Sequence, residues 1–109
     1  MKLSLIEIDF AVAVAQGWNA EKGAIGQCRA SEKGFYYPTT NKEQCIDLII
    51  NQRIECRSVI YNDKRAWQCM IYNVIDKRIS RVTNINENLT IAACKAFLLS
   101  KHPNGMIEV

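Results

Sequence analysis

Residues 66–74 form the segment that most restricts how this chain can fold. The segment is rich in β-branched and aromatic side chains, which indicates a β-strand. Its two alternating sets of side chains are both largely apolar: Trp67, Cys69 and Ile71 on one side, and Met70, Tyr72 and Val74 on the other. A strand that is apolar on both faces is normally covered on both. We therefore expect a sheet with other elements packed against each of its faces.

Two further strands are expected beside this one. Residues 54–61 have a similar composition, and residues 62–65 between the two segments form a hairpin-type loop. A third strand at residues 77–83 follows a tight turn near Asp76, and residues 84–88 form a polar loop. The result is a three-stranded antiparallel meander, to which residues 106–109 add a last short strand.

Three helices are predicted from their start signals. Ser4 and Glu7 form a capping box before an apolar repeat, so a helix covers residues 5–16 and ends at Gly17. Thr40 and Glu43 form a second capping box, which predicts a short helix at residues 41–51. Asn88 is the expected N-cap of a third helix that continues to residue 101.

Residues 17–37 lack any helical or strand period, because four glycines interrupt them. This irregular segment is long for a compact domain, so it is either a binding loop or contains a short strand. With 109 residues, we expect a single domain covering 1–109. The expected fold class is α+β, a small antiparallel sheet flanked by helices on both faces in an α–β–α sandwich.

Catalytic, metal and cofactor chemistry have little support in the sequence. The five cysteines include no C-x-x-C pair, and His102 is the only histidine, so we expect no metal site and mostly buried thiols. No glycine-rich phosphate-binding motif occurs, and the eleven carboxylates are scattered along the chain. We expect no enzyme activity and no cofactor.

Charge and hydropathy restrict the partners and the location. The net charge of +3 lies within residues 54–84, because the rest of the chain sums to zero. This basic middle part favours anionic partners, and an ordinary solvated sheet face is the alternative explanation. No apolar run approaches the length of a membrane helix, so we expect a cytoplasmic protein with no membrane partner.

Five short motifs give the chain a resemblance to a known family. They are D-F-A-V-A-V-A-Q-G-W at residues 9–18, Y-P-T-T-N at 37–41, a strand beginning at Ile54, Trp67 with Cys69 two positions on, and an A-A-x-x-x-F ending followed by Ser100 and Lys101. With these motifs the chain resembles the NinX-like family of small phage-encoded proteins. Residues 18–34 match no family pattern, and the last helix starts without the usual proline. The resemblance implies a phage or prophage origin, an infected bacterial host and an α–β–α sandwich, but no catalytic residues.

The candidate ligand site combines aromatic faces with positive or N–H groups. Such groups suit the bases and phosphates of a small anionic ligand. The helix start at residues 39–42 offers N–H groups and a lysine, Lys42, for an anion, although a self-capped helix is the alternative. The sequence places suitable residues together only at 36–42 and 57–67, with Trp18 as a possible lid. The predicted ligand-binding residues are Trp18, Tyr37, Thr40, Asn41, Arg57 and Trp67.

Three functions remain open from the sequence. The first is a non-catalytic counter-defence protein that binds and sequesters a small anionic nucleotide-type immune signal, by an analogy of type with other small phage proteins. The second is a protein-binding inhibitor or structural accessory protein that uses a sheet edge or helix face against a host protein. A nucleic-acid-binding module is the third, and it is disfavoured by the modest basic bias. We also expect a homo-oligomer, because Tyr61, Met70 and Tyr72 exceed what a few short helices can cover.

Overall fold

The computed structural model describes residues 3–22, 28–30, 34–75 and 78–102. The helices are α1 (Leu5–Ala15), α2 (Lys42–Gln52) and α3 (Leu89–Lys101). The strands are β1 (Ala20–Lys22), β2 (Cys28–Ala30), β3 (Gly34–Phe35), β4 (Glu55–Tyr61), β5 (Lys64–Ile75) and β6 (Arg78–Asn86). The strand expected at residues 106–109 lies outside the described residues.

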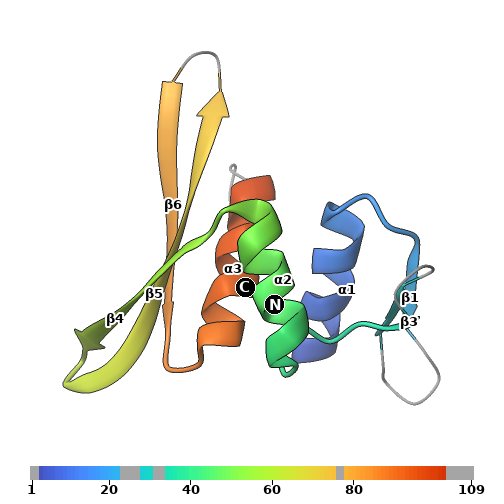
Figure 1. Ribbon diagram of the computed structural model, residues 1–109, viewed down its shortest axis with the longest axis horizontal. Helices are drawn as coiled ribbons and strands as arrows, with labels where there is room; N and C mark the ends of the chain where they lie inside the picture. Colours follow the sequence, from blue (N-terminus) through green and yellow to red (C-terminus); the bar gives the residue numbers. More distant parts are fainter. Residues whose placement is uncertain (1–2, 23–27, 31–33, 76–77, 103–109) are drawn as a thin grey trace.

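The strands of the described chain form two antiparallel sheets, β1-β2-β3 and β4-β5-β6. Helix α3 packs against β5 and β6, α1 and α2 pack against α3, and β1 and β2 pack against α1 (Figure 1). The predicted α+β class with antiparallel pairing is therefore confirmed. The layers differ from the expected sandwich, because the helices lie on one side of the larger sheet, between it and the smaller one (Figure 1). We call the side of β4-β5-β6 away from the helices the outer face.

Helix α3 lies at the centre of the core. Ala92, Ala93, Ala96, Phe97 and Leu98 have no solvent exposure. Small side chains at three of these positions allow the sheet on one side and α1 on the other to approach the helix closely. The helix is therefore buried around most of its circumference rather than along a single stripe.

Helix α1 begins and ends as its sequence signals predict. The Glu7 backbone N–H donates to the Ser4 hydroxyl at 3.3 Å, and the Ser4 N–H donates to the Glu7 carboxylate at 3.2 Å. Gly17 follows the helix with φ of +84°, a backbone conformation that glycine adopts at little energetic expense. The capping box and the stop are both confirmed.

The N-cap of helix α2 lies one residue later than predicted, so the assignment of Thr40 as the cap was wrong. Asn41 is the N-cap, and its side-chain oxygen accepts from the Gln44 backbone N–H at 3.0 Å. Thr40 lies in the preceding turn, where its N–H and that of Asn41 both donate to the Tyr37 carbonyl at 3.0 and 2.9 Å. The Gln44 amide also bonds to the Tyr37 N–H and the Phe35 carbonyl, which fixes this register.

The described residues of the segment predicted as irregular, residues 17–37, include three short strands rather than one. Strand β2 is the middle strand, and it pairs with β1 and with β3. Cys28 and Ala30 of β2 are buried against the core, while Arg29 between them is exposed. This alternation attaches the small sheet to α1.

Two segments that were predicted as loops belong partly to strands of the larger sheet. Asn62 and Asp63 alone form the hairpin turn with φ of 53° and 62°, as in a type I′ turn, and Lys64 and Arg65 belong to β5. Residues 84–86, expected in a loop, belong to β6 and pair with residues 67–69. Because β4 pairs with residues 64–70 and β6 with residues 67–75, only residues 67–70 of β5 have a partner strand on both sides.

Candidate ligand-binding site

A hollow of about 430 Å³ opens where the first turns of α2 and α3 meet the larger sheet. We call it the Trp67 hollow; it is lined by Lys42, Cys45, Ile46, Trp67, Glu87, Asn88, Leu89 and Thr90. Trp67 alternates with buried Cys69 along β5, so its half-buried ring lies on the sheet face that packs against the core. Three elements thus bring an indole ring, a lysine and a helix N-terminus to one place.

The N-terminus of α3 has no side-chain cap. Asn88 is the N-cap residue, but its side chain makes no capping hydrogen bond. The first N–H groups of a helix have no partner within the helix, and they carry the positive end of its dipole. Thr90 holds this end in place, because its hydroxyl donates to the Thr39 carbonyl at 2.6 Å. The positive end of α3 is therefore held firmly at the wall of the hollow.

Charged side chains of both signs surround the Trp67 hollow. Lys42 contributes an ammonium group and Glu87 a carboxylate. The Glu87 carboxylate lies 3.6 Å from the Lys64 ammonium, although both side chains are well exposed and solvent screens the pair. Lys42 and Glu87 offset each other in the lining, so the N-terminus of α3, with Lys64 beside Glu87, makes the contribution that favours an anion.

Arg57 and Trp67, both predicted to bind ligand, lie on opposite faces of the larger sheet. Arg57 pairs with Gln68 in the register, and its Nε donates to the Gln68 side-chain oxygen at 2.8 Å. The neighbouring pair, Cys56 and Cys69, packs in or against the core. Because successive side chains alternate, Arg57 lies on the outer face. The two residues therefore do not line one hollow within a single chain.

Trp18 lies in a different place again. Its ring packs edge-on against Tyr36, with ring centroids 5.0 Å apart and an angle of 75° between the planes. The two rings line a separate hollow of about 210 Å³, together with side chains of α2 that include Asp47. Trp18 is thus packed beside the core and does not close over the other predicted residues.

Tyr37 and Thr40 share a third hollow, also of about 430 Å³, with Asp9. We call it the Asp9 hollow. A buried carboxylate here disfavours an anionic ligand by charge repulsion. Asn41 uses its side-chain oxygen to cap α2. The described residues of one chain therefore do not bring the six predicted residues into one pocket, and their roles in binding stay predictions.

Lys42 was noted in the sequence as a cation beside the N–H groups of residues 39–42, but it was not among the six predicted ligand-binding residues, and Asp9 was not predicted at all. Lys42 was visible in the sequence as the first residue after the α2 N-cap, where a cation adds to the positive end of the helix. Asp9 was visible as a carboxylate within the apolar repeat of α1, where a buried apolar residue is usual.

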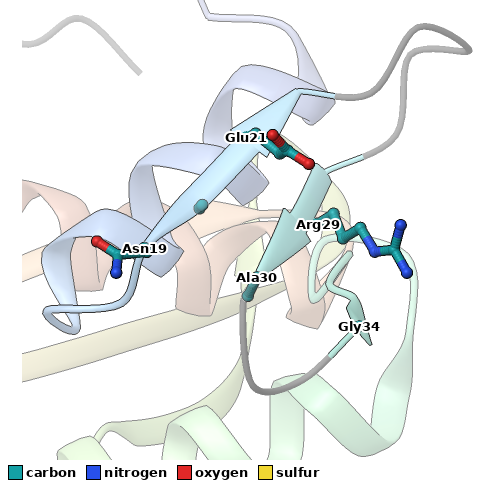
Figure 2. Close-up of a pocket in the computed structure, with 6 residues that line it drawn as sticks. Asn19, Glu21, Arg29, Ala30 and Gly34 are labelled. Carbon is teal, nitrogen blue, oxygen red and sulfur yellow. The ribbon is translucent and has the colours of Figure 1, made fainter.

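A further hollow lies over the small sheet (Figure 2). Figure 2 shows Glu21 on β1 and Arg29 on β2, with Gly34 on β3 below them. Arg29 also lies over the Phe35 ring, 5.6 Å from its centroid. Because one carboxylate and one guanidinium face this hollow, its charge favours neither an anion nor a cation.

A comparison with known protein families tests the family resemblance that the five sequence motifs indicated. The family described as "Bacteriophage P22, NinX" matches residues 2–101. The chain belongs to this NinX family. It is therefore a phage protein, as the resemblance implied.

The NinX match extends over all three helices and both sheets. It includes Lys42 and Trp67, and it includes Asp9 in α1. A search of curated proteins found no match. Among the residues that the structure describes, no helix is long and apolar enough to cross a membrane.

Proposed function

We propose that this NinX-family chain binds a small anionic, nucleotide-type ligand in the Trp67 hollow and holds it without chemical change. Sequestration of such a ligand, as a signal of host immunity, is the counter-defence role that fits a small phage protein of this kind. The observation that carries the proposal is that Lys42, Trp67 and the uncapped N-terminus of α3 line the same hollow.

Each of these groups has a part in the proposed binding. The half-buried indole of Trp67 offers a face on which a base can stack. The Lys42 ammonium and the first N–H groups of α3 are donors for phosphate oxygens. A volume of about 430 Å³ lies within the usual range of small-ligand pockets.

Retention of a nucleotide panel tests the proposal. The purified chain is incubated with cyclic dinucleotides and NAD-derived nucleotides, washed, and then denatured to release what it holds. We expect at least one nucleotide to be retained and released unchanged. Release of an altered product would show an enzyme, and retention of none of the panel would contradict the proposal.

Lys42→Gln tests where the ligand binds. We expect the variant to bind the retained nucleotide roughly 5–30-fold more weakly, which is about 1–2 kcal/mol for the loss of one charge-assisted hydrogen bond. Lys101→Gln is the matched control. It removes the same charge in the last turn of α3, at the end of the helix away from the Trp67 hollow. Titration calorimetry measures both, and equal affinities of the two variants would place the ligand elsewhere.

A protein partner is the second candidate function. Strand β4 lies at an edge of its sheet in the described chain, and Ile60 on it is 71% exposed. An open strand edge with an exposed apolar side chain is a known docking geometry. Failure of the chain to retain any nucleotide, together with capture of a host protein that Ile60→Lys abolishes, would favour this function.

A further inference from the structure

The Asp9 hollow combines apolar walls with a polar base. Its volume is about 430 Å³, and it lies between the start of α1 and the segment that joins β3 to α2. Leu5, Ile6, Phe35 and Tyr37 line it, and each of these large apolar side chains is 37–50% exposed. Such side chains gathered around one hollow are more than the scattered exposed apolar residues of an ordinary surface.

Asp9 at the base is 3% exposed. Its Oδ1 accepts from the Thr39 backbone N–H at 2.9 Å, and burial raises the pKa of the carboxyl group. Within the described part of the chain, no lysine or arginine forms an ion pair with it. A buried carboxylate without a cation is costly, so a cationic partner that enters the hollow gains a large electrostatic contribution.

Thr39 supplies a second polar atom at the base. The residue is 2% exposed, and its hydroxyl lies close enough to Asp9 for side-chain hydrogen bonding to lower the pKa of that carboxyl, although the hydroxyl has no well-formed hydrogen bond with the described residues. A buried hydroxyl without a partner is uncommon in folded proteins. A donor placed between this hydroxyl and the Asp9 carboxylate would bond to both.

We propose that the Asp9 hollow binds a primary alkylammonium group, with the ammonium on Asp9 and Thr39 and the alkyl stem between Leu5, Ile6, Phe35 and Tyr37. An ammonium group has three compact donors, and the exposed aromatic rings attract its charge. A guanidinium fits less well, because it prefers both carboxylate oxygens and Oδ1 is already engaged. The same chemistry is carried by a free alkylamine and by the lysine side chain of a protein partner.

Binding of hexylammonium, followed in backbone amide NMR spectra, tests the proposal. We expect saturable shifts, on the order of 1 mM in Kd, at residues 5–9 and 35–40, including the Thr39 N–H that bonds to Asp9. Hexanol has the same stem without the charge, so we expect it to bind at least tenfold more weakly. Equal binding of the two compounds, or no saturation by hexylammonium, would overturn the proposal.

Asp9→Asn is the decisive variant. It removes the charge but keeps an oxygen for the Thr39 N–H, and we expect it to bind hexylammonium at least tenfold more weakly. Glu21→Gln removes an exposed carboxylate from the small sheet as the matched control, and we expect it to bind like the parent. Unchanged binding by Asp9→Asn would overturn the proposal.

Phe35→Ala keeps the test decisive if Asp9→Asn does not fold. Phe35 is half exposed, so the chain tolerates its loss, and we expect several-fold weaker binding. Full affinity in this variant would overturn the proposal.

A blocked lysine, Nα-acetyl-lysine methylamide, distinguishes the two sources of the ammonium group. Binding like that of hexylammonium supports the lysine side chain of a protein partner, and binding of hexylammonium alone supports a free amine.

Discussion

Folding changes the pKa of Tyr36 more clearly than that of any other tyrosine in the described chain. Its side chain is 4% exposed, and its hydroxyl oxygen accepts from the Gln16 side-chain amide at 2.9 Å. Burial is the main cause that raises the pKa of Tyr36 to about 12. An unfolded chain ionises tyrosine near pH 10. Between these two values the unfolded state loses a proton that the folded state keeps.

We therefore expect the free energy of unfolding to fall as the pH rises from 10 to 12, by roughly 2–3 kcal/mol from Tyr36 alone. Tyr36→Phe should fall less steeply, because phenylalanine does not ionise. Urea denaturation from pH 8 to pH 11 measures the slopes, with Tyr37→Phe, at a site that is 41% exposed and away from the outer face, as the control. Burial also raises the pKa of Cys28 and Cys56, so part of the slope stays in every variant. Equal slopes in the parent and Tyr36→Phe would contradict the role of Tyr36.

At the scale of an element, the start of α2 shows that a local sequence pattern can predict a helix without deciding which residue caps it. T-x-x-E at residues 40–43 and N-x-x-Q at residues 41–44 both resemble helix starts, one residue apart. Gln44 decides between them through its bonds to Tyr37 and Phe35 before the helix. Those bonds depend on the turn and on β3, which no local pattern contains.

We expect Asn41→Ala to lower the free energy of unfolding by about 1 kcal/mol, because it removes the cap of α2. Thr40→Ala should have a smaller effect, since its hydroxyl only approaches the Tyr37 carbonyl at 3.5 Å. Ser4→Ala, at the confirmed cap of α1, gives the reference value. Thermal or urea denaturation compares the three, and a larger loss for Thr40→Ala than for Asn41→Ala would restore the sequence-based cap.

For the remaining elements, predictability from the sequence depends on whether the signals that define them lie within a few neighbouring residues. Helices α1 and α3 and the β4–β5 hairpin have their signals within a few residues, so their positions were predictable. Strands β1, β2 and β3 are two or three residues long, and their pairing depends on contacts that glycine-rich sequence does not encode. Residues 84–86 look like a loop by composition, and only pairing with β5 makes them a strand.

The candidate site was predictable in kind but not in place. Sequence supplied the residue types for an anion, including Trp67, but not which of them meet. The sequence could have predicted that Arg57 and Trp67 do not share a sheet face. A hairpin loop with an even number of residues places positions 57 and 67 on opposite faces, whether the loop has two residues or four. The meeting of Lys42 with Trp67 depends on how α2 and α3 pack, and no periodicity reports that.

At the scale of the whole molecule, the outer face of the larger sheet has no helix over it in the described chain (Figure 1). Tyr61 and Tyr72 lie on that face by the register, and they are 53% and 49% exposed. Met70 was expected to need the same cover, but it is only 5% exposed, so that part of the expectation was wrong. Arg57, Gln68 and Arg81 share this face by the register. Exposed aromatic side chains on an uncovered sheet face are a surface that self-association commonly buries. We therefore expect the predicted homo-oligomer to be a two-fold pair that joins through the outer faces.

Light scattering at tens of micromolar should give about twice the chain mass of 12.4 kDa. Tyr72→Lys should shift the pair toward single chains, because it places charge in the joined faces. Ile60→Lys is the control, since Ile60 alternates with Tyr61 and lies on the other face. A single-chain mass for the parent, or dissociation by Ile60→Lys alone, would contradict this arrangement.

The stagger of the larger sheet has a consequence for how the chain opens. Residues 67–70 of β5 are flanked by strands on both sides, whereas residues 64–66 and 71–75 each have one neighbour. A two-stranded ribbon is marginal by itself, so each end can fray while the middle, which packs on the core through Trp67 and Cys69, stays closed. Amide protons at the two ends should therefore exchange with solvent independently of each other, and those at residues 67–70 only when the chain unfolds as a whole.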